Sequence, residues 1–284
     1  MKQILVASDF SERSNRAVRR ARQLAQEQGA QVLLLHVVDD DRPQRLVAGE
    51  AAAARELLEQ TLGTMLHDVH GKADVVLGDP FDRIAKVARN IGADLIVMGA
   101  HRRQILKNIF VGTSIERVIR ENVAPVLMVN SEGTGPYQRA LVAVDLSEQS
   151  AHALQVARAL HILHRAQVVV VHAFDVVAAS KLAFAGVAAD RVESHRHEAA
   201  AIARSELVQF LADLELGNEP YDIRVKEGGA ARVILETAID TAADIVIMGT
   251  HGRTGIPKLL LGSVTDETVG HLDRDILVVP SRRT

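Results

Sequence analysis

The sequence predicts an α/β fold made of two tandem, doubly wound, Rossmann-like sheets, each with five parallel strands in the order 3-2-1-4-5. Three observations support this prediction. The chain repeats itself once, each copy alternates short apolar runs with longer amphipathic segments, and a glycine-containing loop follows the fourth apolar run of both copies. Continuous apolar runs such as VLLLHV and LIVM are typical of parallel strands that are buried on both faces.

The internal repeat divides the chain into two domains. ILVASDFSERS at Ile4 aligns with ALVAVDLSEQS at Ala140, an offset of 136 residues, and ADLIVMG at Ala93 aligns with ADIVIMG at Ala243, an offset of 150. The second copy therefore has 14 additional residues, and we expect them to lengthen a helix at 180–214, with a break at Gly186, because they are almost four helical turns. The expected domains are residues 1–132 and 137–284.

Each copy should contain the same series of elements. In the first copy, apolar runs predict strands at 3–8, 31–37, 73–77, 94–98 and 125–129. Amphipathic patterns predict helices at 12–28, 48–70, 81–91 and 114–122, and the first three should end at Gly29, Gly71 and Gly92, where a glycine can adopt left-handed geometry. The second copy repeats the series from 138 to 279.

Composition excludes several classes of function. A net charge of −3 gives no electrostatic basis for binding nucleic acid or an anionic membrane, and only 3% of residues are aromatic. With no cysteine there is no disulfide or thiol chemistry, and we find no metal-binding cluster; His195 and His197 do not share a helix face. No apolar stretch predicts a signal peptide or a membrane span, so we expect a cytoplasmic protein.

The candidate site follows from the fold. Ligands of open α/β sheets lie beyond the carboxyl ends of the strands, where the winding reverses. Asp9 and Asp145 follow the first strand of each half, and loops beginning at Gly99 and Gly249 follow the fourth. These loops end at the start of a helix, whose free N–H groups suit phosphate. The same residues also have structural interpretations, since the aspartates resemble helix-entry residues and Thr113–Glu116 and Ser263–Asp266 resemble capping boxes.

Together these residues resemble the universal stress protein family, once in each half. The second half contains the complete pattern Gly-x2-Gly-x9-Gly-Ser at Gly249, Gly252, Gly262 and Ser263. The resemblance implies an adenine-nucleotide alpha-hydrolase-like fold that binds ATP, with any Mg²⁺ carried by the phosphates. The residues that it implies for this site are Ala143, Val144, Asp145, Ala173, Met248, Gly249, His251, Gly252, Arg253, Gly262, Ser263, Val264 and Thr265.

The first half departs from the family pattern. Arg102 replaces the second glycine, and Ile115 stands where the second half has Thr265. A side chain at a position of close backbone approach should exclude the ligand, so we expect a degenerate site comprising Asp9, Val37, Gly99, His101, Arg102, Gly112, Thr113 and Ser114. Two alternatives remain: Arg102, Arg103 and Lys107 could bind another anion, or Arg102 could pair with Asp9.

The resemblance implies an ATP-binding stress-response regulator with slow or no hydrolysis. One alternative is a nucleotide phosphohydrolase in which Arg253 or Lys258 stabilises the transition state, and another is an interaction scaffold with vestigial pockets. Exposed strand edges predict that 125–129 pairs with 275–279, making the chain an intramolecular pseudo-dimer. A homodimer could form through the long helix, whose apolar residues Leu182, Phe184, Val187 and Val192 more simply face the core.

Overall fold

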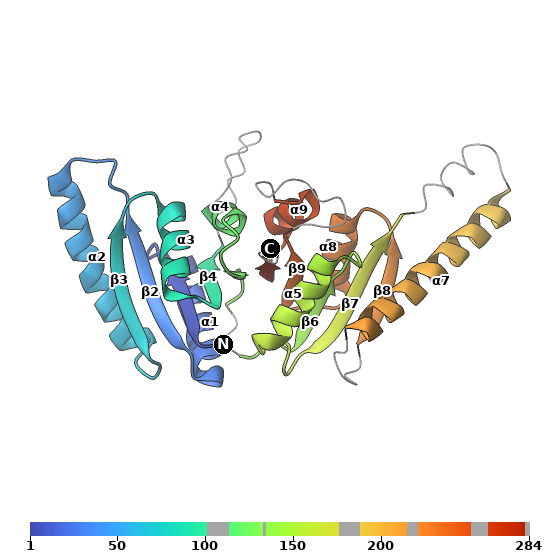
Figure 1. Ribbon diagram of the computed structural model, residues 1–284, viewed down its shortest axis with the longest axis horizontal. Coiled ribbons are helices and arrows are strands. Elements are labelled where there is room, and N and C mark those ends of the chain that lie inside the picture. Colours follow the sequence, from blue (N-terminus) through green and yellow to red (C-terminus); the bar gives the residue numbers. More distant parts are fainter. Residues whose placement is uncertain (101–113, 133–134, 176–187, 215–220, 251–260, 282–284) are drawn as a thin grey trace.

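The computed structural model describes residues 1–100, 114–132, 135–175, 188–214, 221–250 and 261–281. Both halves contribute to one continuous sheet of ten strands in the order β3-β2-β1-β4-β5-β10-β9-β6-β7-β8 (Figure 1). Each half therefore has the predicted order 3-2-1-4-5, counted from the outer edge of the sheet toward its centre.

The elements of the first half alternate as the sequence predicts. The strands are β1 (Gln3–Ala7), β2 (Gln31–Val38), β3 (Gly71–Leu77), β4 (Leu95–Gly99) and β5 (Val126–Val129), all parallel. The described helices are α1 (Glu12–Gln28), α2 (Gln44–Met65), α3 (Pro80–Ile91) and α4 (Ser114–Arg120).

The second half repeats this series. Its strands are β6 (Arg139–Ala143), β7 (Gln167–Phe174), β8 (Asp222–Glu227), β9 (Ile245–Gly249) and β10 (Asp275–Val279). The described helices are α5 (Glu148–Ala159), α7 (Ala189–Asp213), α8 (Ala230–Asp240) and α9 (Ser263–His271). Among the described helices, none combines the length and the apolar character that a membrane crossing requires.

Two of the three predicted glycine caps are confirmed. Gly29 and Gly92 end α1 and α3 with φ values of 63° and 61°, and their N–H groups bond to helix carbonyls. The prediction for Gly71 was wrong: α2 ends at Met65, and Gly71 is the first residue of β3, paired with Val32. A Cβ at Gly71 would lie 2.8 Å from Leu62 Cδ2, so this glycine permits close packing of α2.

The insertion does not simply lengthen a helix. Helix α7 has 25 residues and its counterpart α2 has 22, so most of the added residues lie outside α7. Residues 176–187, which include Gly186, Leu182, Phe184 and Val187, lie outside the described part of the chain. Of the four apolar residues predicted on this helix, Val192 is described, and it is buried.

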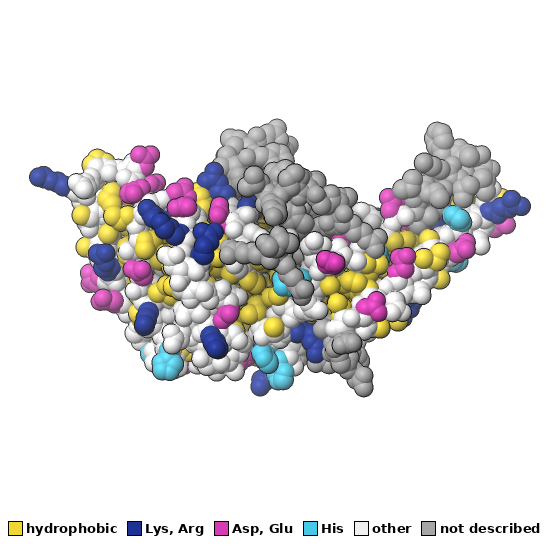
Figure 2. All heavy atoms as spheres, viewed as in Figure 1, with side chains coloured by type: hydrophobic (Ala, Val, Ile, Leu, Met, Phe, Trp, Pro, Cys, Tyr) yellow, Lys and Arg dark blue, Asp and Glu magenta, His cyan; other side chains and the backbone are white. Residues whose placement is uncertain are grey.

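Helices cover both faces of the sheet and separate two cores. One core contains residues of α1, α2, α5 and α7, and the other contains residues of α3, α4, α8 and α9. The inner strands thus bury side chains on both faces, as their continuous apolar sequences predict, whereas the edge strands β3 and β8 are largely half-buried or exposed. Figure 2 shows charged side chains of both signs interspersed over the outer surface of the first half, as expected where helices turn their apolar stripes toward the sheet.

The halves join through their last strands. Strands β5 and β10 pair antiparallel, with Val126, Leu127 and Met128 opposite Val278, Leu277 and Ile276. The predicted pairing of 125–129 with 275–279 is therefore confirmed. All six side chains are at most 4% exposed, so this junction is buried from solvent to the same extent as the core of either half.

A buried polar network reinforces the junction on one side. Asp275 is fully buried and its carboxylate accepts hydrogen bonds from the backbone N–H groups of Asn130 and Ser131, at 2.9 and 2.8 Å, and from the Tyr137 hydroxyl at 2.7 Å. Arg20, from α1, lies 3.4 Å from the same carboxylate and 4.2 Å above the Tyr137 ring. Burial, followed by the charge of Asp275, raises the pKa of Tyr137 well above 10, so its hydroxyl remains a neutral donor.

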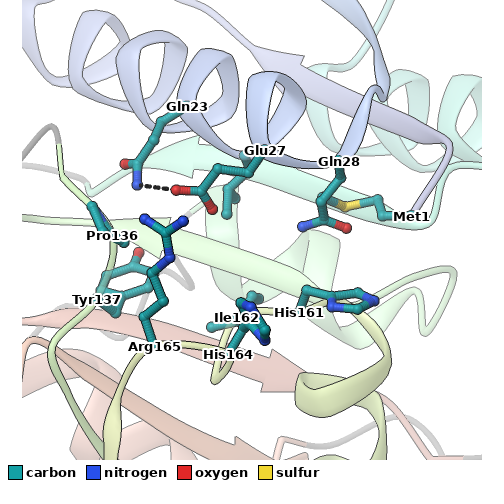
Figure 3. A pocket seen from close by; sticks show the side chains of 11 residues that line it. Met1, Gln23, Glu27, Gln28, Pro136, Tyr137, His161, Ile162, His164 and Arg165 are labelled. Carbon is teal, nitrogen blue, oxygen red and sulfur yellow. Dashed lines mark hydrogen bonds between the residues drawn. The ribbon is translucent and has the colours of Figure 1, made fainter.

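The halves also meet where α1 lies beside the turn between α5 and β7 (Figure 3). Gln28 Nε2 donates to the Leu160 carbonyl at 2.7 Å across this seam. Met1, Pro136 and Tyr137 complete a pocket of about 410 Å³, with Glu27 on the α1 wall and Arg165 on the opposite wall. The seam is thus hollowed and lined by both polar and apolar side chains, in contrast to the fully apolar pairing of β5 with β10.

Candidate functional site

The winding of each half reverses between its first and fourth strands. β1 lies between β2 and β4, and β6 lies between β7 and β9. Asp9 and Asp145 follow the carboxyl ends of β1 and β6, while Gly99 and Gly249 end the neighbouring strands β4 and β9. The structure therefore brings the aspartates, Gly99 and Gly249 to the position where α/β sheets bind ligands.

Both aspartates hold the serine that begins the next helix. Asp145 Oδ1 accepts from Ser147 N–H at 3.2 Å and from its hydroxyl at 2.5 Å, and Asp9 makes the same two bonds to Ser11 at 3.0 and 2.5 Å. Each serine in turn caps its helix. The helix-entry interpretation is thus confirmed for both aspartates.

The backbone of this turn is strained in both halves. Phe10 and Leu146, which follow the aspartates, both have a φ of 62°. Large residues rarely adopt this left-handed conformation, and strained residues are concentrated at functional sites. Partial burial of the Asp9 carboxyl would raise its pKa, but the hydrogen bonds from Ser11 and Ser14 and the charge of Arg13 together hold the pKa below its usual value. The carboxylate is therefore ionised at neutral pH.

A histidine is hydrogen-bonded to the carbonyl of the residue before each aspartate. The sequence analysis assigned no role to these histidines. His172 Nδ1 lies 2.9 Å from the Val144 carbonyl oxygen, and His36 Nδ1 lies 2.8 Å from that of Ser8. The N–H groups of Val144 and Ser8 donate to the same neighbouring strands, at 3.0 and 2.9 Å. The available signal was a histidine at the same place in both copies, in the runs VLLLHV and VVVVHA.

The start of α9 is tied to the end of β9. Gly262 is the N-cap residue, its N–H donates to the Thr250 carbonyl at 3.0 Å, and no side chain caps the helix. The capping-box interpretation of Ser263 and Asp266 was therefore wrong. Ser263 is exposed in the first turn, where the N–H groups of a helix favour an anion.

The hydroxyl of Thr265, a residue that the family resemblance implies for the site, has a partner within the protein. It is 3% exposed, and its hydroxyl donates to the Gly249 carbonyl at 2.9 Å. Its counterpart Ile115 is buried as well, at 2% exposure. The two halves thus differ at this position in how the helix is tied to the strand, since only threonine can make this hydrogen bond.

Gly99 has a structural explanation. A Cβ at this position would lie 2.4 Å from the backbone carbonyl oxygen of Arg13, at the start of α1. Glycine here lets α1 approach the end of β4. The presence of Gly99 in the first half therefore does not by itself indicate a working ligand site there.

The remaining predicted residues are accounted for as follows. Met248, Ala143 and Val144 are buried, Val264 is half-buried, and Ala173 and Val37 are half-buried on β7 and β2, the strands beside the aspartates. Ser114 begins α4. The predictions for His101, Arg102, Arg103, Lys107, Gly112, Thr113, His251, Gly252, Arg253 and Lys258 lie outside the described residues.

The doubly wound sheet, repeated in tandem, places these residues where α/β proteins of this architecture hold their ligands. The model of the universal stress protein family matches residues 1–130 and 136–280, so the chain belongs to that family. Universal stress protein MJ0577 of Methanocaldococcus jannaschii is 31% identical over 157 residues, which are 47% of this chain and 97% of that protein.

Two further comparisons cover more of the chain. Universal stress protein E of Escherichia coli K12 is 27% identical over 207 residues, or 70% of this chain and 65% of that protein. The crystal structure of a universal stress protein from Archaeoglobus fulgidus covers 98% of both chains with a TM-score of 0.73 at 18% identity. The tandem fold is therefore shared along the whole length of a solved protein.

Proposed function

We propose that this chain is a stress-response regulatory protein that binds ATP in its second half and hydrolyses it slowly or not at all. Mg²⁺, where it is bound, is carried by the phosphates. The chain acts as an intramolecular pseudo-dimer, with the first half as the degenerate partner. The convergence of Asp145, Ala173, Gly249 and the start of α9 at one reversal point carries this proposal.

The geometry supports a definite orientation of the nucleotide. A carboxylate repels phosphate, so Asp145 accepts from a ribose hydroxyl and the phosphates lie toward the start of α9. Gly262 leaves the N–H groups of the first helical turn without a side-chain cap. Ala173, half-buried on β7 beside Asp145, supplies the apolar contact for the adenine.

The test compares Asp145→Ala with Asp9→Ala. Both substitutions remove the same two hydrogen bonds to a capping serine, so each variant serves as a control for the loss of that cap. Only Asp145→Ala should weaken ATP binding, by about 10- to 100-fold, because a hydrogen bond to a charged group contributes about 1.5–3 kcal/mol. The measurement is titration calorimetry with ATP and Mg²⁺. Equal losses in the two variants, or a larger loss in Asp9→Ala, would contradict a site confined to the second half.

A further inference from the structure

We infer that His172 is the positioning residue of the nucleotide site, acting through the Val144 carbonyl to set the direction of the Asp145 carboxylate. This inference rests on the proposed function and goes beyond it, since His172 is not among the residues that the family resemblance implies for the site. The Nδ1 atom of His172 points to the backbone at the end of the neighbouring strand.

The hydrogen-bond geometry assigns the tautomer of His172. A carbonyl oxygen only accepts hydrogen bonds, so the Nδ1 atom, 2.9 Å away, carries the hydrogen. His172 is 7% exposed and Val144 is 5% exposed, so water cannot easily replace this donor. The Val144 N–H donates to the Val171 carbonyl at 3.0 Å. Both backbone polar groups of Val144, the residue before Asp145, are therefore hydrogen-bonded to residues of β7.

These two hydrogen bonds of Val144 lie next to a strained part of the backbone. Leu146 has a φ of 62° directly after Asp145, and such a conformation persists only when its surroundings determine it. With Val144 fixed on one side and the Ser147 cap of α5 fixed on the other, the Asp145 carboxylate has one orientation. Releasing Val144 frees the turn from one side, so the carboxylate should lose its preorganisation for the ligand.

The first half contains the same arrangement of a histidine bonded to the carbonyl of the residue before the aspartate. His36 Nδ1 bonds to the Ser8 carbonyl at 2.8 Å, the Ser8 N–H donates to Leu35, and Phe10 has the same φ of 62°. His36 also stacks on Phe10, with 4.4 Å between the ring centroids. Removing His36 therefore imposes the same kind of backbone loss in the half where the nucleotide motif is broken.

The test uses three substitutions of His172 and one of His36. His172→Phe keeps the ring and removes the donor, so the Kd for ATP with Mg²⁺ should rise about tenfold or more. His172→Asn places an amide nitrogen at the position of Nδ1 and should restore binding to within about threefold of the wild type. His172→Gln carries its amide one carbon further out and should not restore it. His36→Phe should leave the Kd unchanged. All titrations are made at a temperature where circular dichroism shows each variant folded.

A second readout does not depend on the nucleotide. Amide hydrogen exchange at Ser147, whose N–H bonds to Asp145, should accelerate about tenfold in His172→Phe and stay unchanged in His36→Phe; Ser11 should show the reverse. Unchanged exchange at Ser147 would overturn the positioning role. Faster exchange with wild-type ATP affinity would overturn its link to binding. Failure of the wild-type protein to bind ATP would reject the proposed function, while the exchange results would still decide whether His172 orders the turn.

Discussion

Replacing Asp275 by alanine is expected to lower the free energy of unfolding by about 3–5 kcal/mol, because breaking a buried ion pair leaves the other charge unpaired. Arg20 is 2% exposed and would keep its charge without the carboxylate. The N–H groups of Asn130 and Ser131 and the Tyr137 hydroxyl would lose their acceptor at the same time. Urea denaturation, followed by circular dichroism, measures this loss.

Matched variants separate the network from a general effect of removing an acid. Glu206→Ala removes an exposed acidic side chain from α7 and should change the stability by no more than about 0.5 kcal/mol. Tyr137→Phe deletes one charge-assisted hydrogen bond and should cost about 1.5–3 kcal/mol. A loss below about 1 kcal/mol in Asp275→Ala would mean that the network contributes little to joining the halves.

The network is confined to one side of the junction. At the offset of 150 residues the counterpart of Asp275 is Pro125, and at 136 residues that of Arg20 is Val156. The network therefore needs both halves. The second half supplies the Asp275 carboxylate, and the first half supplies Arg20 and the N–H groups after β5. This asymmetry favours pairing between unlike halves, although the strand pairing itself would serve either arrangement.

Gly252→Arg is expected to abolish ATP binding, with a loss of affinity of at least about a hundredfold, or about 2.7 kcal/mol. The substitution copies the arginine that the first half has at position 102. A side chain at a position used for close approach of the backbone blocks the ligand, and a left-handed conformation would add about 1–2 kcal/mol of strain. The affinity is measured by calorimetry with ATP and Mg²⁺.

Thr254→Arg is the control for this prediction. It adds the same charge to the same loop, at a position that the glycine motif does not include. It should bind ATP within a few-fold of the wild type, and circular dichroism should show that both variants are folded at the temperature of the titration. Normal ATP binding by Gly252→Arg would show that the arginine of the first half does not explain a lost site.

The fold could be predicted from the sequence because its signals are local and occur twice. Apolar runs gave each strand of the first half to within two residues, and Gly29 and Gly92 marked helix ends through a backbone conformation that favours glycine. Gly71 was misassigned because a glycine also allows close packing, here against Leu62. The sequence pattern does not distinguish a glycine that caps a helix from one that allows close packing.

The candidate site was only partly predictable. Asp145 and Gly249 could be placed because the reversal point follows from strand order alone. The role of His172 depends on the register between β6 and β7, and within an apolar run a histidine resembles any other core residue. Thr265 was expected to face the ligand, yet its hydroxyl bonds to Gly249, since the orientation of a side chain in the first helical turn depends on how the helix docks.

The central claim is that the second half holds one adenine nucleotide and the first half holds none. The most direct measurement is to denature freshly purified protein, separate the released small molecules by chromatography, and count adenine nucleotide per chain. We expect close to one per chain, recovered largely as ATP. A value near two would contradict the degenerate first half, and no nucleotide, followed by no binding in a titration with ATP and Mg²⁺, would contradict nucleotide binding altogether.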